Sequence, residues 1–511
     1  MWWARSKRDG MPLKKVLGTE TEYGVTVSGP GDVSPVLVAS MLVGQYGQAE
    51  LRRVKWDFQE ENPLRDARGF EAARNREAAE EEGALVNLVL TNGARYYVDH
   101  AHPEFSTPET TNPRDCVLWD KAGEAILASS IRRTLEVMAP GSRVHVYKNN
   151  SDGKGNSYGT HENYLVDRAV PFARLAASLI PFFVTRQLYT GAGKVGCEES
   201  GVDGIDYQIG QRADFMEAEV GLETTLKRPI VNTRDEPHAD PERFRRLHVI
   251  CGDANMCEVT NFLKMGTAAL LLLLIEDDVL DIESFTLAAP VESFKTVSRD
   301  LSLTRTLELI DGRHVSALDL QWEYLDAVKG YLKTGAADEA LEGAEWPEDV
   351  VARWEYVLTA LEADPSTLAR ELDWVAKREL LEAYRERNDL DWSSPKLKLI
   401  DLQFHDVDPD RGLYYRLVAG DRVERLVTDG EIGDAMISPP RDTRAYFRGS
   451  CLARYATSLV AASWDALIFD LDGQTLKRVP MLDPFKGTAE HTQALLEAHA
   501  TPASLITALS G

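Results

Sequence analysis

The sequence predicts an α+β fold with a large domain and a smaller C-terminal domain. Short segments in which polar and apolar residues alternate, as along β-strands, lie between longer segments with the apolar spacing of helices. With 511 residues, the chain is too long for one compact core. We assign residues 1–13 to an N-terminal extension, 14–430 to the large domain and 431–511 to the small one, ahead of the turn at Ser438-Pro439-Pro440.

Composition and charge exclude several classes of protein. The apolar content of 44% and the charged content of 27% are ordinary for a soluble globular protein. The formal net charge of −25 argues against a nucleic-acid-binding protein, which needs a basic surface. The strongest apolar run, residues 268–275, is too short to span a membrane and predicts a buried helix.

The cysteines and the first residues indicate the compartment. Five cysteines are scattered along the chain without a CxxC pair, as expected for free thiols in a reducing cytoplasm. Residues 1–10 have charges but not the apolar stretch of a signal peptide. The sequence shows no coiled-coil pattern and no apolar stripe that requires a second copy. We therefore predict a monomeric, cytoplasmic protein with no nucleic-acid or membrane partner.

The first predicted strand begins near Lys15 and carries two carboxylates. Glu20 and Glu22 are two residues apart, so both leave the same face of the strand. Two adjacent like charges raise each other's pKa unless a cation lies between them. A divalent metal such as Mg²⁺ accounts for the pair, because it prefers hard oxygen ligands. A solvent-facing pair is the commoner alternative.

Residues 40–50 predict a short helix, and residues 52–83 predict a long loop. The loop segment includes WDFQEENPLRDARGF, has a turn signal at Asn62-Pro63 and shows little periodicity of a core element. Loops of this length inside a compact domain are usually functional or disordered. We expect it to be partly mobile and to join the first strand to the strand at 94–99.

A second strand follows the turn at Asn92-Gly93. Arg95, Tyr97 and Asp99 alternate with apolar residues and share one face, and His102-Pro103 then ends the strand and brings Glu104 nearby. A cation, a phenol and a carboxylate on one face are costly to bury unless they are paired, bound to metal or catalytic. The alternative is an edge strand with a solvated face.

The rest of the large domain alternates between predicted helices and strands. Residues 143–148 predict a strand that leads into the glycine-rich NNSDGKGNSYG, which resembles a phosphate cradle but lacks the GK[ST] of a P-loop. His161 and Asn163 then share a strand face, as do Arg246 and His248. A single histidine is more often structural than a ligand. Helices are predicted at 114–138, 170–190, 258–277 and within 316–388, strand-like structure at 205–235, and a strand or short helix at 396–404.

The recurrence of this pattern is the main functional signal. Four separate strand-like segments each place polar residues at positions i and i+2. If these strands share one sheet, carboxylates and imidazoles on one face can hold one to three Mg²⁺ ions, while Arg95 and Arg246 can meet phosphate oxygens. Such a face is equipped for ATP-dependent phosphoryl transfer without a P-loop. The alternative, four unrelated solvated faces, requires four coincidences.

Several longer motifs resemble one known family. GTETEYG, NGARYYVDHAHPE, YKNNSDGKGNSYGTHENYL, NTRDEPHADPERFRRLHVICGDANM and TRAYFRG closely resemble the Pup ligase/depupylase family of actinobacteria, from about residue 14 to the C-terminus. The segment VKWDFQEENPLRDARGF is similar to the loop that distinguishes the depupylases from the ligases. The resemblance implies the fold of glutamine synthetase: a large catalytic domain with a curved, mostly antiparallel sheet packed by helices, and a small C-terminal domain.

The resemblance also implies a site for ATP (or ADP plus phosphate) with Mg²⁺, and a groove for the acidic protein Pup. Asp99 matches the family's essential aspartate, which acts as nucleophile or base. Arg212 and Arg234 are candidate anchors for the carboxylates of Pup's C-terminal residue. The matching motifs further imply metal ligands at Glu20, Glu22, Tyr97, Glu104, His161 and His248, and nucleotide contacts at Arg95, Asn163 and Arg246.

The implied activity is that of a depupylase and deamidase. Such an enzyme hydrolyses the side-chain amide of the C-terminal Gln of Pup to Glu, and cleaves the isopeptide bond between Pup and lysines of pupylated proteins. One alternative is a Pup–protein ligase that forms this bond through a γ-glutamyl phosphate. The other is a non-catalytic module that binds Pup or a nucleotide, against which the presence of Asp99, Glu20 and Glu104 argues.

Overall fold

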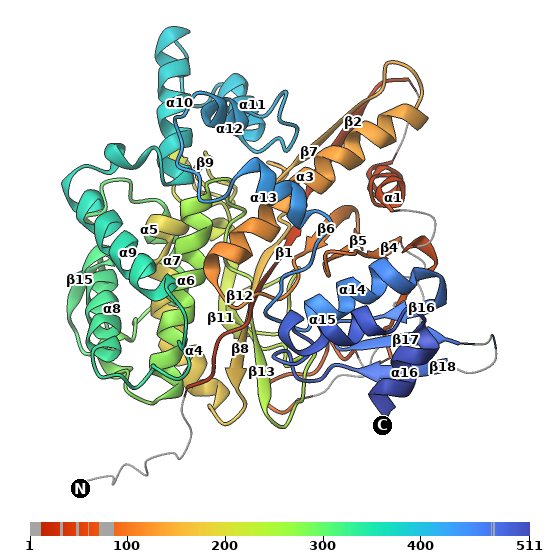
Figure 1. The fold of residues 1–511 in the computed structure, drawn as a ribbon. Helices are drawn as coiled ribbons and strands as arrows, with labels where there is room; N and C mark the ends of the chain where they lie inside the picture. Colours follow the sequence, from red (N-terminus) through yellow and green to blue (C-terminus); the bar gives the residue numbers. More distant parts are fainter. Residues whose placement is uncertain are drawn as a thin grey trace, which may run out of the picture.

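The computed structural model describes residues 12–30, 34–47, 51–59, 61–70, 86–471, 473 and 476–510. Residues 1–11 of the predicted extension and residues 71–83 of the predicted loop lie outside this part. The large domain is organised around a six-stranded sheet in the order β13-β8-β1-β6-β5-β4, in which every neighbouring pair is antiparallel (Figure 1). Its strands are β1 (Leu17–Glu22), β4 (Asn87–Val89), β5 (Arg95–Asp99), β6 (His102–Ser106), β8 (Thr160–Asp167) and β13 (Phe244–Val249).

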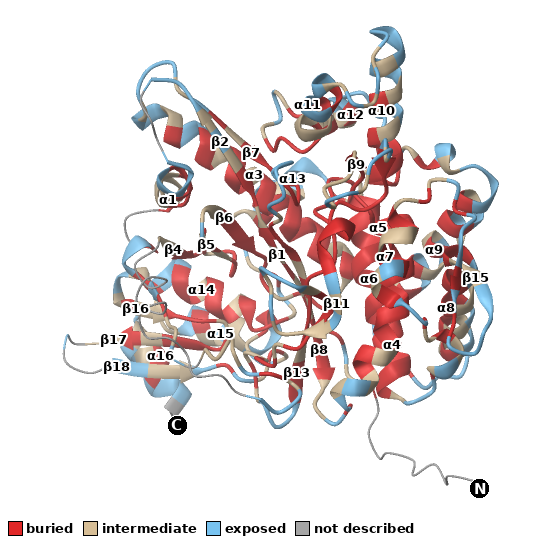
Figure 2. Ribbon diagram, turned by 180° about the vertical axis from the view of Figure 1, so that it is seen from behind, coloured by how far each residue is buried: buried red, intermediate tan, exposed pale blue. Residues whose placement is uncertain are grey.

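One face of this sheet packs on helices. Along β8 and β13, Tyr164, Val166, Leu247 and Val249 belong to the largest hydrophobic core, which they share with α6 (Glu258–Glu276). Along β5 and β6, the apolar side chains join a second core with α1 (Pro35–Tyr46) and α3 (Pro113–Val137). The buried backbone of the central strands is visible from behind in Figure 2. Because successive residues alternate between faces, this packing directs the intervening polar residues to the opposite face.

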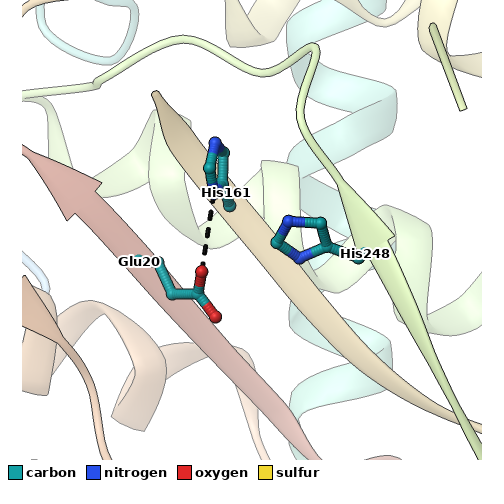
Figure 3. Close-up of side chains that lie close together, drawn as sticks. All are labelled: Glu20, His161 and His248. Carbon is teal, nitrogen blue, oxygen red and sulfur yellow. Dashed lines mark hydrogen bonds and ion pairs between the residues drawn. The ribbon is translucent and has the colours of Figure 1, made fainter. Parts of the chain in front are cut away.

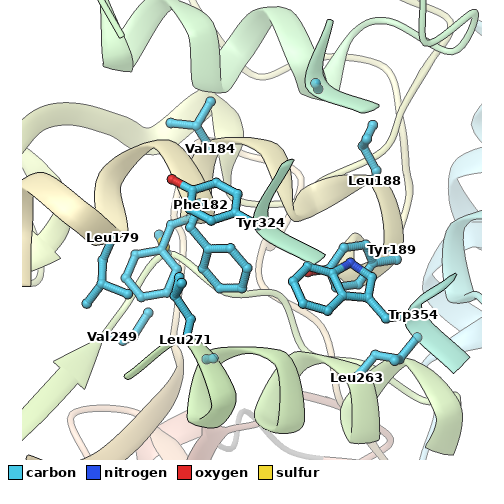
Figure 4. Packing of buried hydrophobic residues seen from close by; sticks show 14 of the residues in the cluster. Leu179, Phe182, Val184, Leu188, Tyr189, Val249, Leu263, Leu271, Tyr324 and Trp354 are labelled. Carbon is cyan, nitrogen blue, oxygen red and sulfur yellow. The ribbon is translucent and has the colours of Figure 1, made fainter. Parts of the chain in front are cut away.

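Helix α6 (Glu258–Glu276) is the centre of the helical half. It is long and apolar enough to cross a membrane, but every one of its residues is buried inside the protein, as expected for a core helix. The prediction of a buried helix here is confirmed. Beside it, the rings of Tyr324 and Trp354 each meet the ring of Phe182 edge to face (Figure 4). The surrounding helices are α4 (Phe172–Thr185), α5 (Gln187–Thr190), α7 (Pro290–Ser298), α8 (Ala317–Leu332) and α9 (Trp346–Ala363).

Smaller elements frame the sheet. Residues 396–404, for which the sequence allowed a strand or a helix, form helix α11 (Pro395–Phe404), whose first turn is capped by the Ser394 hydroxyl. The remaining helices here are α10 (Asp373–Arg387), α12 (Leu413–Ala419) and α13 (Asp429–Ala435). The remaining strands are β2 (Gly24–Ser28), β7 (Arg143–Tyr147), β9 (Lys194–Val195), β10 (Tyr207–Gln208), β11 (Met216–Gly221), β12 (Arg228–Asn232), β14 (Thr306–Glu308) and β15 (His314–Ser316).

The C-terminal unit has its own sheet, in the order β18-β17-β16-β3. Its fourth strand, β3 (Lys55–Trp56), comes from the start of the predicted loop and pairs in parallel with β16. The sequence did not predict this strand. Residue 430 lies within helix α13, which packs against α3, so the division of the chain at that residue stays a proposal. The other elements are α14 (Ala445–Tyr455), β16 (Leu459–Ala462), β17 (Ala466–Asp470), β18 (Leu476–Pro480), α15 (Ala489–Ala498) and α16 (Pro502–Ser510).

A buried ion-pair cluster joins this unit to the central sheet. Glu109, which follows β6, accepts a hydrogen bond from Arg444 Nε at 2.8 Å and from both terminal nitrogens of Arg448. Arg448 is fully buried and also donates to the carbonyl oxygens of Gly93 and Trp464. Burial alone would raise the pKa of Glu109, but the two arginines outweigh it and hold the pKa at about 2.

Glu109→Gln is expected to lower the free energy of unfolding by about 3–5 kcal/mol, because it leaves buried arginines without a counter-charge. Since the folded-state pKa of Glu109 is depressed, its contribution is complete above the ordinary value of 4.5 and is lost as the pH falls toward 2. Urea unfolding between pH 3 and pH 7 measures both effects. Glu355→Gln, which breaks an exposed pair with Lys329, is the control and should cost at most about 1 kcal/mol. An equal cost for the two variants would contradict the role given to Glu109.

Candidate active site

The strand register brings the polar pairs onto one face of the central sheet. Glu20 lies opposite His161 of β8 and Ser106 of β6, while Asn163 lies opposite His248 of β13. Directly opposed residues of antiparallel strands point to the same side. The four i, i+2 pairs predicted from the sequence therefore share one face. The same relation places Glu22, Glu104 and Tyr97 in one cross-strand row, with Arg95 and Asp99 on either side of Tyr97.

Glu20, His161 and His248 form a first group that can hold a metal. One ligand atom from each lies within 4.8 Å of the other two. Their side chains point toward one another from β1, β8 and β13, and His161 Nδ1 is 3.4 Å from Glu20 Oε2 (Figure 3). His248 Nδ1 is 2.9 Å from Asn163 Oδ1, and its buried Nε2 has no hydrogen-bond partner among the described residues. Burial and the nearby Arg246 lower the pKa of His248, which favours the neutral imidazole that binds metals.

Glu22, Asp99 and Glu104 form a second group of the same kind, also within 4.8 Å of one another. Glu104 is only 3% exposed, and burial together with the neighbouring Asp99 and Glu22 raises its pKa well above the ordinary range. Three carboxylates this close repel one another unless a cation lies between them. Oxygen ligands suit Mg²⁺, so this carboxylate group fits the cation that the sequence implied. Tyr97 lies opposite Glu104, and burial raises the pKa of its phenol.

Glu22 is held by a histidine and a glycine that were not predicted as site residues. His102 Nδ1 lies 3.5 Å from Glu22 Oε2, and the Gly159 N–H donates to Glu22 Oε1 at 3.0 Å. Burial opposes ionisation of Glu22, but His102, His161 and Arg212 outweigh it and hold the pKa at about 2. The carboxylate is thus ionised at neutral pH. The glycine directly before β8 is the sequence feature that could have predicted a close contact between the backbone at this position and the Glu22 side chain.

Gly159→Ala is expected to reduce activity by more than about tenfold with the fold retained, because misplacing a metal ligand or its support has that scale of cost. A Cβ at this position would overlap His161 Nε2 and lie 2.8 Å from Glu22 Oε1. Steady-state kinetics with Mg²⁺ titration, alongside thermal unfolding, measures the effect. The control is Gly330→Ala in α8, where a Cβ meets nothing within 4 Å. Unchanged kinetics for Gly159→Ala would contradict the prediction, because they would show that neither candidate metal-binding group needs a glycine here to place its side chains.

Asn163 and Arg246 orient the first group. Asn163 Nδ2 donates to Glu20 Oε1 at 2.9 Å. Arg246 Nη1 lies 3.0 Å from Asn163 Oδ1 and 3.3 Å from Glu20 Oε1, and its Nε donates to the carbonyl oxygen of Glu236. Arg246 Nη2 is buried and lies 3.6 Å from Glu236 Oε2 in an ion pair, but it has no hydrogen-bond partner within the described ranges. A guanidinium nitrogen of this kind can receive an anion.

Arg95 is held by aromatic rings. Its guanidinium carbon is 4.0 Å from the ring centre of Trp56 and 3.8 Å from that of Tyr97. Its Nε donates to Asn87 Oδ1 at 3.0 Å. Trp56 and Asn87 were not predicted as site residues. Asn87 lies opposite Tyr97, but this can be known only from the β4–β5 register. Trp56 belongs to the segment that was predicted as a loop.

Arg212 and Arg234 lie off the sheet, at its border. Arg212 is 1% exposed, and its Nη1 donates to the Tyr158 carbonyl oxygen at 3.0 Å. Burial and the neighbouring Arg228 lower the pKa of Arg212 to about 10, against the opposing effect of Glu22. Arg234 follows β12, and its backbone pairs with Asp66 of the predicted loop. The Nε atoms of both arginines are buried and form no hydrogen bond with any residue that the structure describes.

A cavity opens beside the first group, between the sheet and the C-terminal unit. Glu20, Asn163 and Arg246 line it on the sheet side, and Arg444 and Trp464 line it on the C-terminal side. Most of the remaining wall is apolar. The cavity therefore offers an apolar chamber with guanidinium and carboxylate groups on one wall, a combination that suits a ligand with a flat ring and an anionic tail.

Comparison with known proteins gives consistent matches. The family model described as Pup-ligase protein matches residues 15–468. The chain is 52% identical over 507 residues to the depupylase of Acidothermus cellulolyticus, which covers 98% of this chain and 100% of that protein. It is 37% identical over 495 residues to the Pup–protein ligase of Renibacterium salmoninarum, which covers 96% of this chain and 98% of that protein.

Two solved structures of the ligase PafA are similar over most of the chain. The complex of PafA with Pup has a TM-score of 0.77 and 31% identity, and the match covers 97% of this chain and 94% of that one. The complex of PafA with ADP has a TM-score of 0.72 and 33% identity, covering 84% and 96%. Together with the antiparallel central sheet, these similarities confirm the predicted α+β fold.

Proposed function

The chain belongs to the Pup-ligase family, and from that premise we propose that it is a depupylase and Pup deamidase. It hydrolyses the side-chain amide of the C-terminal Gln of Pup to Glu, and it cleaves the isopeptide bond between Pup and substrate lysines. The depupylase relative is 52% identical and the ligase relative 37% identical, each over nearly the full length. The single structural observation that carries the proposal is the position of Asp99 within the Glu22–Glu104 carboxylate group.

Mg²⁺ fits the carboxylate group on the sheet face, whose ligands are oxygens, and we assign a second ion to the first group, which offers one carboxylate and two imidazoles. Glu20, His161 and His248 would hold one ion, and Glu22 and Glu104, with Tyr97 beside them, would hold another. His248 Nε2, which has no hydrogen-bond partner among the described residues, and the mutual repulsion of the three carboxylates support this assignment. When bound, the metal supplies positive charge that stabilises the oxyanion formed on the substrate amide.

The nucleotide belongs in the cavity between the sheet and the C-terminal unit. Arg246 and Asn163 reach its wall, and Arg246 Nη2 is available to a phosphate oxygen. Arg95 lies across the sheet from them, on the same face. The solved complex of PafA with ADP supports this choice of ligand. ATP, or ADP with phosphate, acts as a cofactor that completes the site and is not consumed in each turnover.

Asp99 carries out the bond-breaking step. On one route its carboxylate attacks the carboxamide carbon, expels ammonia or the lysine amine after proton transfer to that nitrogen, and leaves an anhydride that water hydrolyses. On the other route it takes a proton from water, the hydroxide attacks the same carbon, and the proton passes to the departing nitrogen as the C–N bond breaks. Both routes yield Pup ending in Glu. Hydroxylamine added during turnover traps an anhydride only on the first route.

Arg212 and Arg234 anchor the substrate. Each keeps a buried N–H without a partner in the described part of the chain, and guanidinium groups bind carboxylates well. The carboxylates of Pup's C-terminal residue are the proposed ligands. The complex of PafA with Pup supports Pup as the macromolecular partner. We further propose that the protein acts as a monomer in the cytoplasm.

Ammonia release tests the proposed activity. The full-length protein is incubated with Pup ending in Gln, Mg²⁺ and ATP, and ammonia, ADP and phosphate are measured together. A deamidase releases ammonia without matching ATP consumption. A ligase consumes one ATP for each bond formed with lysine and releases no ammonia from Pup ending in Gln. Nucleotide binding without either reaction would instead identify a binding module.

A further inference from the structure

Trp56 belongs to a row of stacked side chains that connects the C-terminal unit to the polar sheet face. The guanidinium carbon of Arg448 lies 5.0 Å from the Trp464 ring centre. The rings of Trp464 and Trp56 meet edge to face, with centres 5.4 Å apart and an interplanar angle of 73°. The guanidinium carbon of Arg95 lies 4.0 Å from the Trp56 ring centre and 3.8 Å from the Tyr97 ring centre.

The Trp56 indole is fixed in place. It is 5% exposed, and its Nε1 donates to Glu61 Oε1 at 2.6 Å. Its backbone belongs to β3, which pairs with β16 of the C-terminal sheet. The indole therefore has little freedom to move away from Arg95. The ring of Trp464, on its far side, also lines the cavity proposed for the nucleotide.

Among the described residues, aromatic rings lie against the Arg95 guanidinium and one side chain accepts from its Nε. The rings are those of Trp56, Tyr97 and, at 5.8 Å, Phe58, and the acceptor is Asn87. Its terminal nitrogens contact no acceptor in the described part of the chain. A stacked guanidinium keeps its in-plane N–H groups for phosphate oxygens, because stacking uses the faces and hydrogen bonding uses the edge. Without the stack, a long arginine side chain would sample many rotamers.

We propose that Trp56 is a positioning residue that holds the Arg95 guanidinium against Tyr97 and presents its terminal nitrogens to a phosphate group on the sheet face. The inference rests on the proposed function, because it takes the ligand of Arg95 to be the nucleotide phosphate. It assigns a specific contact to the segment at residues 51–59. In this arrangement the Trp56 ring lies between Trp464, which lines the cavity, and Arg95, the proposed phosphate ligand.

A double-mutant cycle in the full-length protein tests this role. ATP and ADP affinities are measured by calorimetry for wild type, Trp56→Leu, Trp56→Phe, Arg95→Gln and the Trp56→Leu/Arg95→Gln double variant. Trp56→Leu is expected to weaken nucleotide binding by about 3- to 30-fold, the range of a cation–π contact. Trp56→Phe should recover most of the affinity because it keeps a ring. In the Arg95→Gln background, Trp56→Leu should cause no further loss.

The matched control is Trp392→Leu. Trp392 also lies under an arginine, with the Arg385 guanidinium carbon 5.8 Å from its ring centre, but it lines neither the cavity nor the carboxylate groups. Its removal should leave nucleotide affinity unchanged. A loss of affinity on Trp56→Leu that is equally large with and without Arg95 would overturn the positioning role. If Trp56→Leu does not fold, the cycle is run with Trp56→Phe, for which a smaller loss that still requires Arg95 is expected.

Thermal unfolding without nucleotide gives a second readout. The melting-temperature losses of Trp56→Leu and Arg95→Gln should sum to more than the loss of the double variant, because both remove the same contact. Strict additivity in the absence of nucleotide would also overturn the proposal. Failure of the proposed function has a different signature: wild-type protein would bind nucleotide and show the coupled cycle, yet release no ammonia from Pup ending in Gln.

Discussion

Asp99→Asn is expected to abolish both ammonia release from Pup ending in Gln and cleavage of the isopeptide bond between Pup and lysine. Asparagine has nearly the same shape as aspartate, but it can neither attack the carboxamide carbon nor accept a proton from water. Loss of a general base alone costs about 10²- to 10⁴-fold in rate, and loss of a nucleophile costs at least as much. ATP affinity should be nearly unchanged, because Asp99 does not line the cavity.

The control for this variant is Asp311→Asn, which removes an exposed carboxylate paired with Arg313. Both rates should then match wild type. Rates are measured with Pup ending in Gln and with a purified pupylated protein, and ATP affinity is measured by calorimetry on the same samples. Retention of either reaction by Asp99→Asn, with the protein folded, would rule out the role given to Asp99.

Glu104→Gln is expected to remove the response of the protein to Mg²⁺. Glu104 is the buried member of the carboxylate group, and an amide oxygen replaces a charged ligand with a neutral one. Loss of a support in the second coordination shell already costs about 10- to 100-fold in metal affinity or activity, so a direct ligand should cost more. Because repulsion among three carboxylates is relieved, the metal-free variant should be at least as stable as metal-free wild type.

Thermal unfolding with and without Mg²⁺ measures this effect directly. Wild type should gain melting temperature on addition of Mg²⁺, because an ion that binds only the folded state stabilises it. Glu104→Gln should gain much less, and Glu308→Gln, which removes an exposed glutamate of β14, should respond like wild type. Chelation by EDTA should stop both reactions, and Mg²⁺ should restore them. Full activity in EDTA would contradict the metal assignment.

The strand period explains how much of the site the sequence could predict. Side chains alternate along a strand, so Glu20 with Glu22, or His161 with Asn163, had to share a face wherever a strand formed. This alternation does not predict which strands are neighbours in the sheet. The pairing of β1 with β8, which places Glu20 opposite His161, depends on contacts more than a hundred residues apart. The prediction that the pairs share one sheet succeeded because burying each polar face separately would have been costly.

The segment at residues 51–70 shows where the sequence was insufficient. The parallel pairing of β3 with β16 joins residues about four hundred positions apart, and a two-residue strand has no readable period. The stacking of Trp56 on Arg95 follows from that pairing, so it was missed as well. Further along, Asp66 accepts a hydrogen bond from Thr233, which anchors this segment beside Arg234. The positions of Arg212 and Arg234 depend on loops, for which periodicity gives no guidance.

The central claim is that one face of the antiparallel sheet binds divalent metal and phosphate beside Asp99. Anomalous diffraction from crystals grown with ADP, phosphate and Mn²⁺ in place of Mg²⁺ tests it most directly. We predict one Mn²⁺ peak among Glu20, His161 and His248, a second beside Glu22 and Glu104, and phosphate oxygens in contact with Arg95 or Arg246. Mn²⁺ bound only elsewhere, or nucleotide density away from this face, would contradict the claim.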